Sequence, residues 1–163
     1  MYYQSLPLMK IEEEIQSKFK SEYEKLIVNL YLTHSRLSEP FAALIKGHDI
    51  TSTQYNVLRI LRGQKQKPAS IGLIKERMIE RNSDVSRIID RLLKKKLIIR
   101  NENKLDRRQK DIIISQLGLD LVAKIENREV DFHHNLDHIS LEEAKMMNDL
   151  LDKIRSAPKE EEE

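Results

Sequence analysis

The side chains in this sequence that could do chemistry are hydroxyls and cationic groups, concentrated in the segment from Asn82 to Lys96. Serine hydroxyls and arginine guanidinium groups donate hydrogen bonds to anionic oxygens. Read as a helix with about 100° per residue, the segment separates into two faces, and the polar one is suited to bind an anion. The apolar face holds Val85, Ile88, Ile89, Leu92 and Leu93, and the polar face holds Ser83, Ser86, Arg87, Asp90, Arg91 and Lys94.

The charge of the chain is unevenly distributed around this segment. Residues 59–110 hold 17 Lys and Arg against 6 Asp and Glu, a local charge of +11, and the rest of the chain carries −9. Such segregation indicates a surface for a polyanion such as nucleic acid, although a solvated charged face is the alternative interpretation.

The composition favours one mainly helical, cytoplasmic domain of 163 residues. The chain has no cysteine, which excludes disulfides and thiolate metal sites. It has no apolar run of about 18 residues, so no membrane span is expected, and its start lacks the pattern of a secretory signal. No phosphate-binding loop and no nucleophile with a partnered base is recognisable, so we expect no enzyme activity and no cofactor.

The elements that must position the basic helix are predicted from periodicity. Residues 10–46 read as one long amphipathic helix, either continuous or broken at its start. Pro40 should disturb it, because proline lacks an N–H. A second helix, residues 52–62, is expected to bury Tyr55, Val57, Leu58 and Leu61. A third helix runs from Ser70 to about Ile79, and Asn82 or Ser83 is expected to cap the basic helix that follows. Two short helices joined by a tight turn predict a helix-turn-helix.

Two runs rich in β-branched residues, 97–100 and 111–115, follow the basic helix and predict a β-hairpin with a basic tip. A hairpin directly after a helix-turn-helix is a winged helix, with Arg107 and Arg108 at the wing. Beyond it, residues 117–135 and 141–155 read as helices, and the last starts with a capping box of Ser140 and Glu143. The last helix is expected to bury Ala144, Met147, Leu150, Leu151 and Ile154, and residues 156–163 are expected to be a disordered acidic tail.

The motifs in this region resemble the MarR family of bacterial transcriptional regulators. The family pattern is a hydroxyl-rich recognition helix ending in R-L-x-x-K-G-L-I, followed by a D-x-R wing and a turn closed by glycine. The matching residues are Ser83 to Leu92, Lys94 to Ile98, Asp106 to Arg108, and Gly118. The resemblance implies a mainly α chain with a small β-hairpin wing, a dimeric binder of duplex DNA, and usually a repressor that a small ligand releases.

The sequence departs from the family pattern at three places. Lys96 stands where the family usually has the glycine that ends the recognition helix, so it must adopt a left-handed conformation at a cost or end the helix differently. Leu73 replaces a common first-turn glutamate, which leaves the capping box from Ser70 incomplete. Ser115 and the two residues after it replace the usual Leu-Thr before Gly118, although a serine can still cap the next helix.

These observations assign roles along one MarR-like domain spanning 1–163. Residues 51–116 would form the DNA-binding region, and 10–46 and 117–155 the dimerisation helices, because two-fold dimers read two half-sites of a pseudo-palindrome. Ser83, Ser86 and Arg87 would meet base edges or adjacent phosphates, while Arg91 and Lys94 would bind phosphates. The remaining candidates for DNA contact are Ser70, Arg81, Arg107 and Arg108, with Asp106 supporting the wing.

Other interpretations remain for parts of the chain. By resemblance, Tyr31, His34, Phe41 and Tyr55 could line a pocket for a small-molecule inducer, with ordinary core packing as the alternative. His134 and His138 lie four apart, with His133 adjacent, which would suit a metal-responsive regulator, but solvated histidines are the simpler interpretation and we assign no metal site. The alternative of another class is a helical interaction module that binds a protein or an anionic surface through its basic face.

Overall fold

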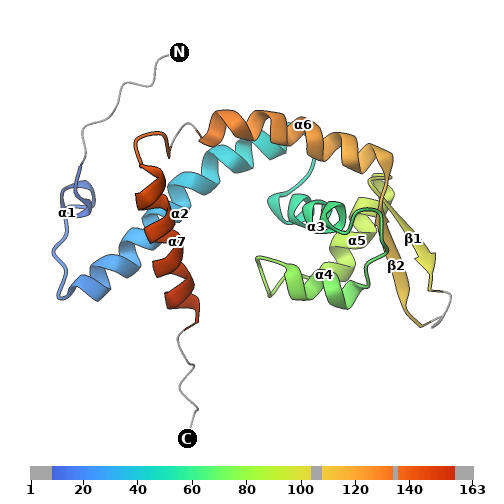
Figure 1. Ribbon diagram of the computed structural model, residues 1–163, viewed down its shortest axis with the longest axis horizontal. Coiled ribbons are helices and arrows are strands. Elements are labelled where there is room, and N and C mark those ends of the chain that lie inside the picture. The colour runs from blue at the N-terminus through green and yellow to red at the C-terminus, as the bar shows by residue number, and fades with distance from the viewer. Residues whose placement is uncertain (1–8, 104–107, 134–135, 157–163) are drawn as a thin grey trace, which may run out of the picture.

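Helices dominate the computed structural model, which describes residues 9–103, 108–133 and 136–156 (Figure 1). The fold class predicted from the sequence, mainly α with a small β-hairpin, is confirmed. The elements in chain order are α1 (Ile11–Glu14), α2 (Glu22–Lys46), α3 (Ser52–Gly63), α4 (Ile71–Arg77), α5 (Val85–Lys94), β1 (Ile98–Glu102), β2 (Lys110–Ile114), α6 (Gln116–His133) and α7 (Leu141–Arg155).

The core lies where α3, α5, the hairpin and α6 meet. The four residues predicted to be buried by the second helix are buried in α3, and each is at most 2% exposed. From α5, Ile89 and Leu92 are fully buried, and from α6, Val122 and Ile125 are too. Burying whole aliphatic side chains stabilises a fold by roughly 1.5–3 kcal/mol each, so this cluster fixes α5 by its apolar face.

The hairpin pairs β1 with β2 in antiparallel register, from Ile98 opposite Ile114 to Glu102 opposite Lys110. It extends further into the polar stretch between the two apolar runs than the sequence indicated. An ion pair of 2.9 Å between Lys110 Nζ and Glu102 Oε1 lies at the last described rung. Ala69, just before α4, forms a bridge to Ile112 and so ties the helix-turn-helix to the sheet.

The N-terminal helix is broken near its start, which the sequence allowed, and it differs from the prediction at Pro40. It is interrupted after α1, and Ser21 caps the start of α2 by accepting a hydrogen bond from the Glu24 N–H at 3.1 Å. The expectation that Pro40 disturbs the helix is wrong, because α2 runs through it to Lys46. Pro40 is exposed, so the carbonyl that loses its helical partner can be hydrated.

The C-terminal helix begins as predicted, but its burial does not follow the prediction. The capping box at its start is confirmed, with the Ser140 N–H donating to Glu143 at 2.8 Å and the Glu143 N–H donating to Ser140 at 3.2 Å. No residue of α7 is buried, and Met147, Leu150 and Ile154 are each about half exposed. Ala144 and Leu151 are only partly buried. The predicted burial is therefore wrong for a single chain.

Apolar side chains are also uncovered on α2. Tyr23 is 81% exposed and Tyr31 is 74% exposed, and Leu26 and Ile27 are exposed as well. In Figure 1, α2 and α7 lie on the side of the molecule away from α4 and the hairpin. None of the helices in the described part of the chain is long and apolar enough to cross a membrane.

Candidate nucleic-acid interface

The helix α5 starts later than the sequence suggested. Its cap is Asp84 rather than Asn82 or Ser83, and the Asp84 carboxylate accepts a hydrogen bond from the Arg87 N–H at 3.1 Å. A carboxylate suits this position because the positive end of the helix dipole favours negative charge. Ser83 therefore lies in the turn before the helix, where its hydroxyl is 3.4 Å from Glu80 Oε2.

The two faces expected for α5 are confirmed by burial. Val85, Ile89 and Leu92 are buried, and Ile88 and Leu93 are partly buried against the same cluster. The polar residues of the helix are exposed, namely Ser86, Arg87, Asp90, Arg91 and Lys94. Packing thus fixes the helix by one face and leaves hydroxyl and cationic groups on the other.

The charge on this exposed face is mainly positive. The carboxylate of Asp90 is paired with Arg100 from β1, at 3.0 Å between Oδ1 and Nη1. Among the described residues, the side chains of Arg87, Arg91 and Lys94 have no ion-pair partner. Their charges are therefore available to an external anion, while the one carboxylate between them is compensated.

The C-terminal end of α5 is built around Lys96. This lysine has a φ of 58°, so it adopts the left-handed conformation, one of the two outcomes expected at this position. The Leu97 N–H donates to the Leu92 carbonyl at 3.1 Å and the Lys96 N–H to the Leu93 carbonyl at 2.9 Å. This pair of bonds is the Schellman motif that normally uses glycine. The chain then turns directly into β1.

The turn between β2 and α6 fits closely against this end. Ser115 donates from its hydroxyl to the Lys96 carbonyl at 2.8 Å and accepts from the Gly118 N–H at 3.1 Å. The expectation that a serine can cap α6 is thus met. A Cβ on Gly118 would lie 2.2 Å from the Leu97 carbonyl oxygen, so only glycine fits here. These contacts fix the wing and α6 relative to α5.

Two further predicted residues lie on either side of α4. Ser70 caps α4 by accepting from the Leu73 N–H at 3.1 Å, and its side chain is half-buried. Arg81 is exposed in the turn and shares a shallow cleft with Lys75 and Glu76 of α4. The turn itself is held by a residue that sequence reasoning missed, since the Asn56 side chain of α3 accepts from the Ile79 N–H at 3.1 Å.

The wing is described only in part. Arg108 is exposed, whereas Asp106 and Arg107 lie outside the described residues. At the base of the tip, Asn103 donates to the Asp111 carboxylate at 2.9 Å. The ion pair with Lys110 holds the pKa of Glu102 below its usual value.

A cavity of about 330 Å³ lies between α2, α3 and the turn after α4, and three of the four predicted pocket residues line it. Phe41 and Tyr55 approach with ring centroids 5.8 Å apart, and His34 lies at the same cavity. Tyr31 is not brought to it, because it lies on an exposed part of α2. Sequence reasoning missed Arg59, whose guanidinium carbon is 6.0 Å from the Tyr55 ring centroid. Its position four residues after Tyr55 on a helix was the available signal.

The metal hypothesis falls partly outside the described residues, because His134 is not among them. His138 is exposed, and within the part of the chain that the structure describes no group of three or more His, Cys, Asp or Glu side chains could hold a metal ion.

The arrangement of α3, α4 and α5 with the hairpin β1–β2 defines a winged helix-turn-helix. Residues 50–110 match the model of the MarR family, the family that the motifs of this region resemble. MarR family proteins are transcription regulators. No curated protein is similar enough to the sequence to match it.

Solved structures of MarR regulators share the fold over most of the chain. A mutant MarR from E. coli complexed with operator DNA is 20% identical, covers 87% of this chain and 100% of its own, and has a TM-score of 0.74. BpsR from Bordetella bronchiseptica, whose DNA binding is regulated by 6-hydroxynicotinic acid, is 22% identical over 87% of this chain and 99% of its own, with a TM-score of 0.70. An organohalide-sensing regulator bound to 2,4-dichlorophenol is 17% identical over 86% of this chain and 85% of its own, with a TM-score of 0.75.

Proposed function

We propose that this protein is a sequence-specific regulator of transcription that binds duplex DNA as a homodimer and acts as a repressor released by a small ligand. The observation that carries the proposal is the two-sided burial of α5. Its apolar face is in the core, and its exposed face presents Ser86, Arg87, Arg91 and Lys94. This arrangement suits a recognition helix in a major groove.

The residues on and around the exposed face of α5 fall into two groups, those that can meet base edges and those that would bind phosphates. Arg87 in the first turn of α5 can fork onto guanine, and Ser83 and Ser86 can meet base edges or nearby phosphates. Arg91 and Lys94 lie further along the helix and would bind phosphates, which position the protein without reading sequence. The wing arginines, with Ser70 and Arg81 beside α4, would add backbone or minor-groove contacts.

A second copy of the chain is the partner we assign to the uncovered apolar faces of α2 and α7. Five of the fifteen residues of α7 are large apolar side chains between 47% and 65% exposed: Leu141, Met146, Met147, Leu150 and Ile154. Monomeric proteins rarely leave such a contiguous stripe uncovered. A dimer would also supply the two recognition helices that a pseudo-palindromic operator requires.

The cavity beside the turn before α5 is the site we assign to a releasing ligand. Its aromatic rings, with Arg59 over Tyr55, suit a small aromatic molecule, and an anionic group would complement the guanidinium. Met78, Ile79 and Glu80 also line it, so a ligand there would touch the segment that leads into the recognition helix.

The experiment that tests the proposal starts with duplexes that the protein selects from a random-sequence pool. Binding to the selected duplex and to a shuffled one is then measured over a range of salt concentrations. We expect a pseudo-palindromic preference and a steep loss of affinity with salt, because phosphate contacts release counterions. Equal affinity for both duplexes would refute sequence-specific recognition and favour the basic interaction module instead. Adding 6-hydroxynicotinate or 2,4-dichlorophenol to the complex tests release by compounds of the type the relatives bind.

A further inference from the structure

We propose that Lys95 and Asp49 form a positioning latch that sets the orientation of the recognition helix α5 relative to the end of α2. The inference rests on the proposed function, because it concerns how α5 is presented to DNA. It gives Lys95 a contact within the protein rather than with DNA, although this lysine lies within the basic run that ends the helix.

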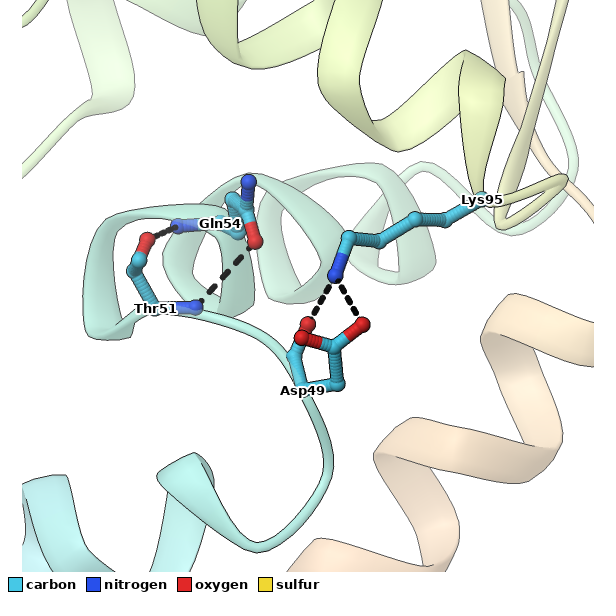
Figure 2. A network of polar contacts seen from close by, with 4 residues as sticks. All are labelled: Asp49, Thr51, Gln54 and Lys95. Atoms are coloured by element: carbon cyan, nitrogen blue, oxygen red, sulfur yellow. Dashed lines mark hydrogen bonds and ion pairs between the residues drawn. The ribbon is translucent and has the colours of Figure 1, made fainter.

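The contact joins two segments far apart in the sequence. Lys95 is the C-cap residue of α5, and its ammonium group donates both to the Asp49 backbone carbonyl and to Asp49 Oδ2, the latter at 2.6 Å. Figure 2 shows the lysine side chain reaching from the end of α5 to the loop between α2 and α3. The ammonium is therefore directed at this loop.

The loop presents its acceptors from a constrained backbone. Asp49 has a φ of 56°, in the left-handed region, and its N–H donates to the Lys46 carbonyl at 3.1 Å. Ile45 and Ile50 on either side are buried, which anchors the loop in the core. The Asp49 carbonyl that accepts from Lys95 is thus fixed from both directions, while the Asp49 carboxylate is exposed and adds the opposite charge.

The start of α3 adds a second rigid point next to this loop. The Thr51 N–H donates to Gln54 Oε1 at 3.1 Å, and the Gln54 N–H donates to the Thr51 hydroxyl at 3.2 Å (Figure 2). Gln54 is 4% exposed, so this capping box sits against the core. Lys95 consequently connects the recognition helix to a junction in which the end of α2 and the start of α3 are both held.

A small tilt of α5 about its C-terminal end would produce a large displacement at its N-terminal end. A ten-residue helix is about 15 Å long, so a tilt of about 10° moves its far end by about 2.5 Å. Arg87 lies near that end, where such a displacement exceeds the tolerance of a hydrogen bond to a base. In a dimer built through α2, the same latch in each protomer would set the spacing between the two recognition helices.

The substitution Asp49→Asn separates this role from general electrostatics. Asparagine tolerates the left-handed conformation, so the backbone is not newly strained. Removing a negative charge from a DNA-binding protein should by itself tighten binding. The latch predicts the opposite, a loss of roughly two- to fivefold on the selected duplex, the range of a surface ion pair. Glu39→Gln is the matched control, because Glu39 is exposed on α2 and the described residues offer it no partner.

Two further measurements complete the test. Lys95→Gln should lose affinity, and combining it with Asp49→Asn should cost no more than Lys95→Gln alone, because Lys95→Gln already removes the contacts to both the Asp49 carboxylate and the Asp49 carbonyl. On duplexes with one base pair inserted between the half-sites, both variants should discriminate less between spacings than the parent protein does. Thermal melting of each variant confirms that it is folded.

The proposal is overturned if Asp49→Asn binds as tightly as the parent or tighter, in line with Glu39→Gln, or if the two substitutions are additive. Failure of the proposed function gives a different result. In that case the parent protein shows no preference for any duplex, and Arg87→Ala leaves binding unchanged. If Asp49→Asn fails to fold, Lys95→Gln and its spacing profile decide the question.

Discussion

Replacing Lys96 by glycine should stabilise the protein, and the size of the gain follows from the backbone. Lys96 has a φ of 58° in the Schellman turn that ends α5. A residue with a Cβ pays roughly 1–2 kcal/mol for this conformation, whereas glycine adopts it freely. The greater freedom of glycine in the unfolded chain offsets part of this difference. We therefore expect Lys96→Gly to raise the free energy of unfolding by about 1 kcal/mol.

Chemical and thermal denaturation measure this gain. For a chain of this size, 1 kcal/mol corresponds to a rise in Tm of about 2–4 °C. Lys96→Ala is the matched control, because it removes the same side-chain charge but keeps the Cβ, and it should give no comparable gain. An unchanged or lower stability of Lys96→Gly would show that the strain assigned to the end of α5 is absent.

Two further predictions concern the outer helices. Leu150→Glu should convert the proposed dimer to a monomer in sedimentation analysis, because it places a charge in the apolar stripe of α7. Asn148→Glu, on a different face of the same helix, should leave the dimer intact, and a Leu150→Glu protein that is still a dimer would refute the interface. The pKa of Glu143 is lowered from 4.5, first by the Ser140 backbone hydrogen bond and then by the Ser140 side chain, so its contribution to stability is present above pH 4.5 and is lost as the pH falls through the lower folded value. Glu143→Gln should therefore reduce the slope of the free energy of unfolding against pH below about pH 5. An unchanged slope would contradict the capping role of Glu143.

The sequence predicted α5 and its buried face because the signal for both is local. The spacing of Val85, Ile89 and Leu92 is enough to define which face is buried, and the structure buries these three residues. The two apolar runs likewise predicted the hairpin. The cap was missed because Asn82, Ser83 and Asp84 are all good capping residues, and only the position of the turn after α4 selects Asp84.

What the sequence could not predict depends on contacts between distant segments. An amphipathic pattern shows that α7 has an apolar face, but it cannot show whether the same chain or another covers it. Tyr31 and His34 are less than one helical turn apart, yet only His34 reaches the cavity. The partnership of Lys95 with Asp49 joins residues 46 positions apart, and nothing in the local pattern of either residue indicates it.

The central claim, that the exposed face of α5 reads DNA, is tested most directly by comparing Arg87→Ala with Arg128→Ala on the selected duplex. Both substitutions remove one exposed arginine and one positive charge. Arg128, however, lies on α6, away from the proposed DNA interface. We predict that Arg87→Ala weakens binding by about tenfold, consistent with roughly 1–3 kcal/mol for a base contact, and narrows the preference over the shuffled duplex. Arg128→Ala should bind like the parent protein. Equal affinities for both variants would contradict the assignment of α5 as the recognition helix.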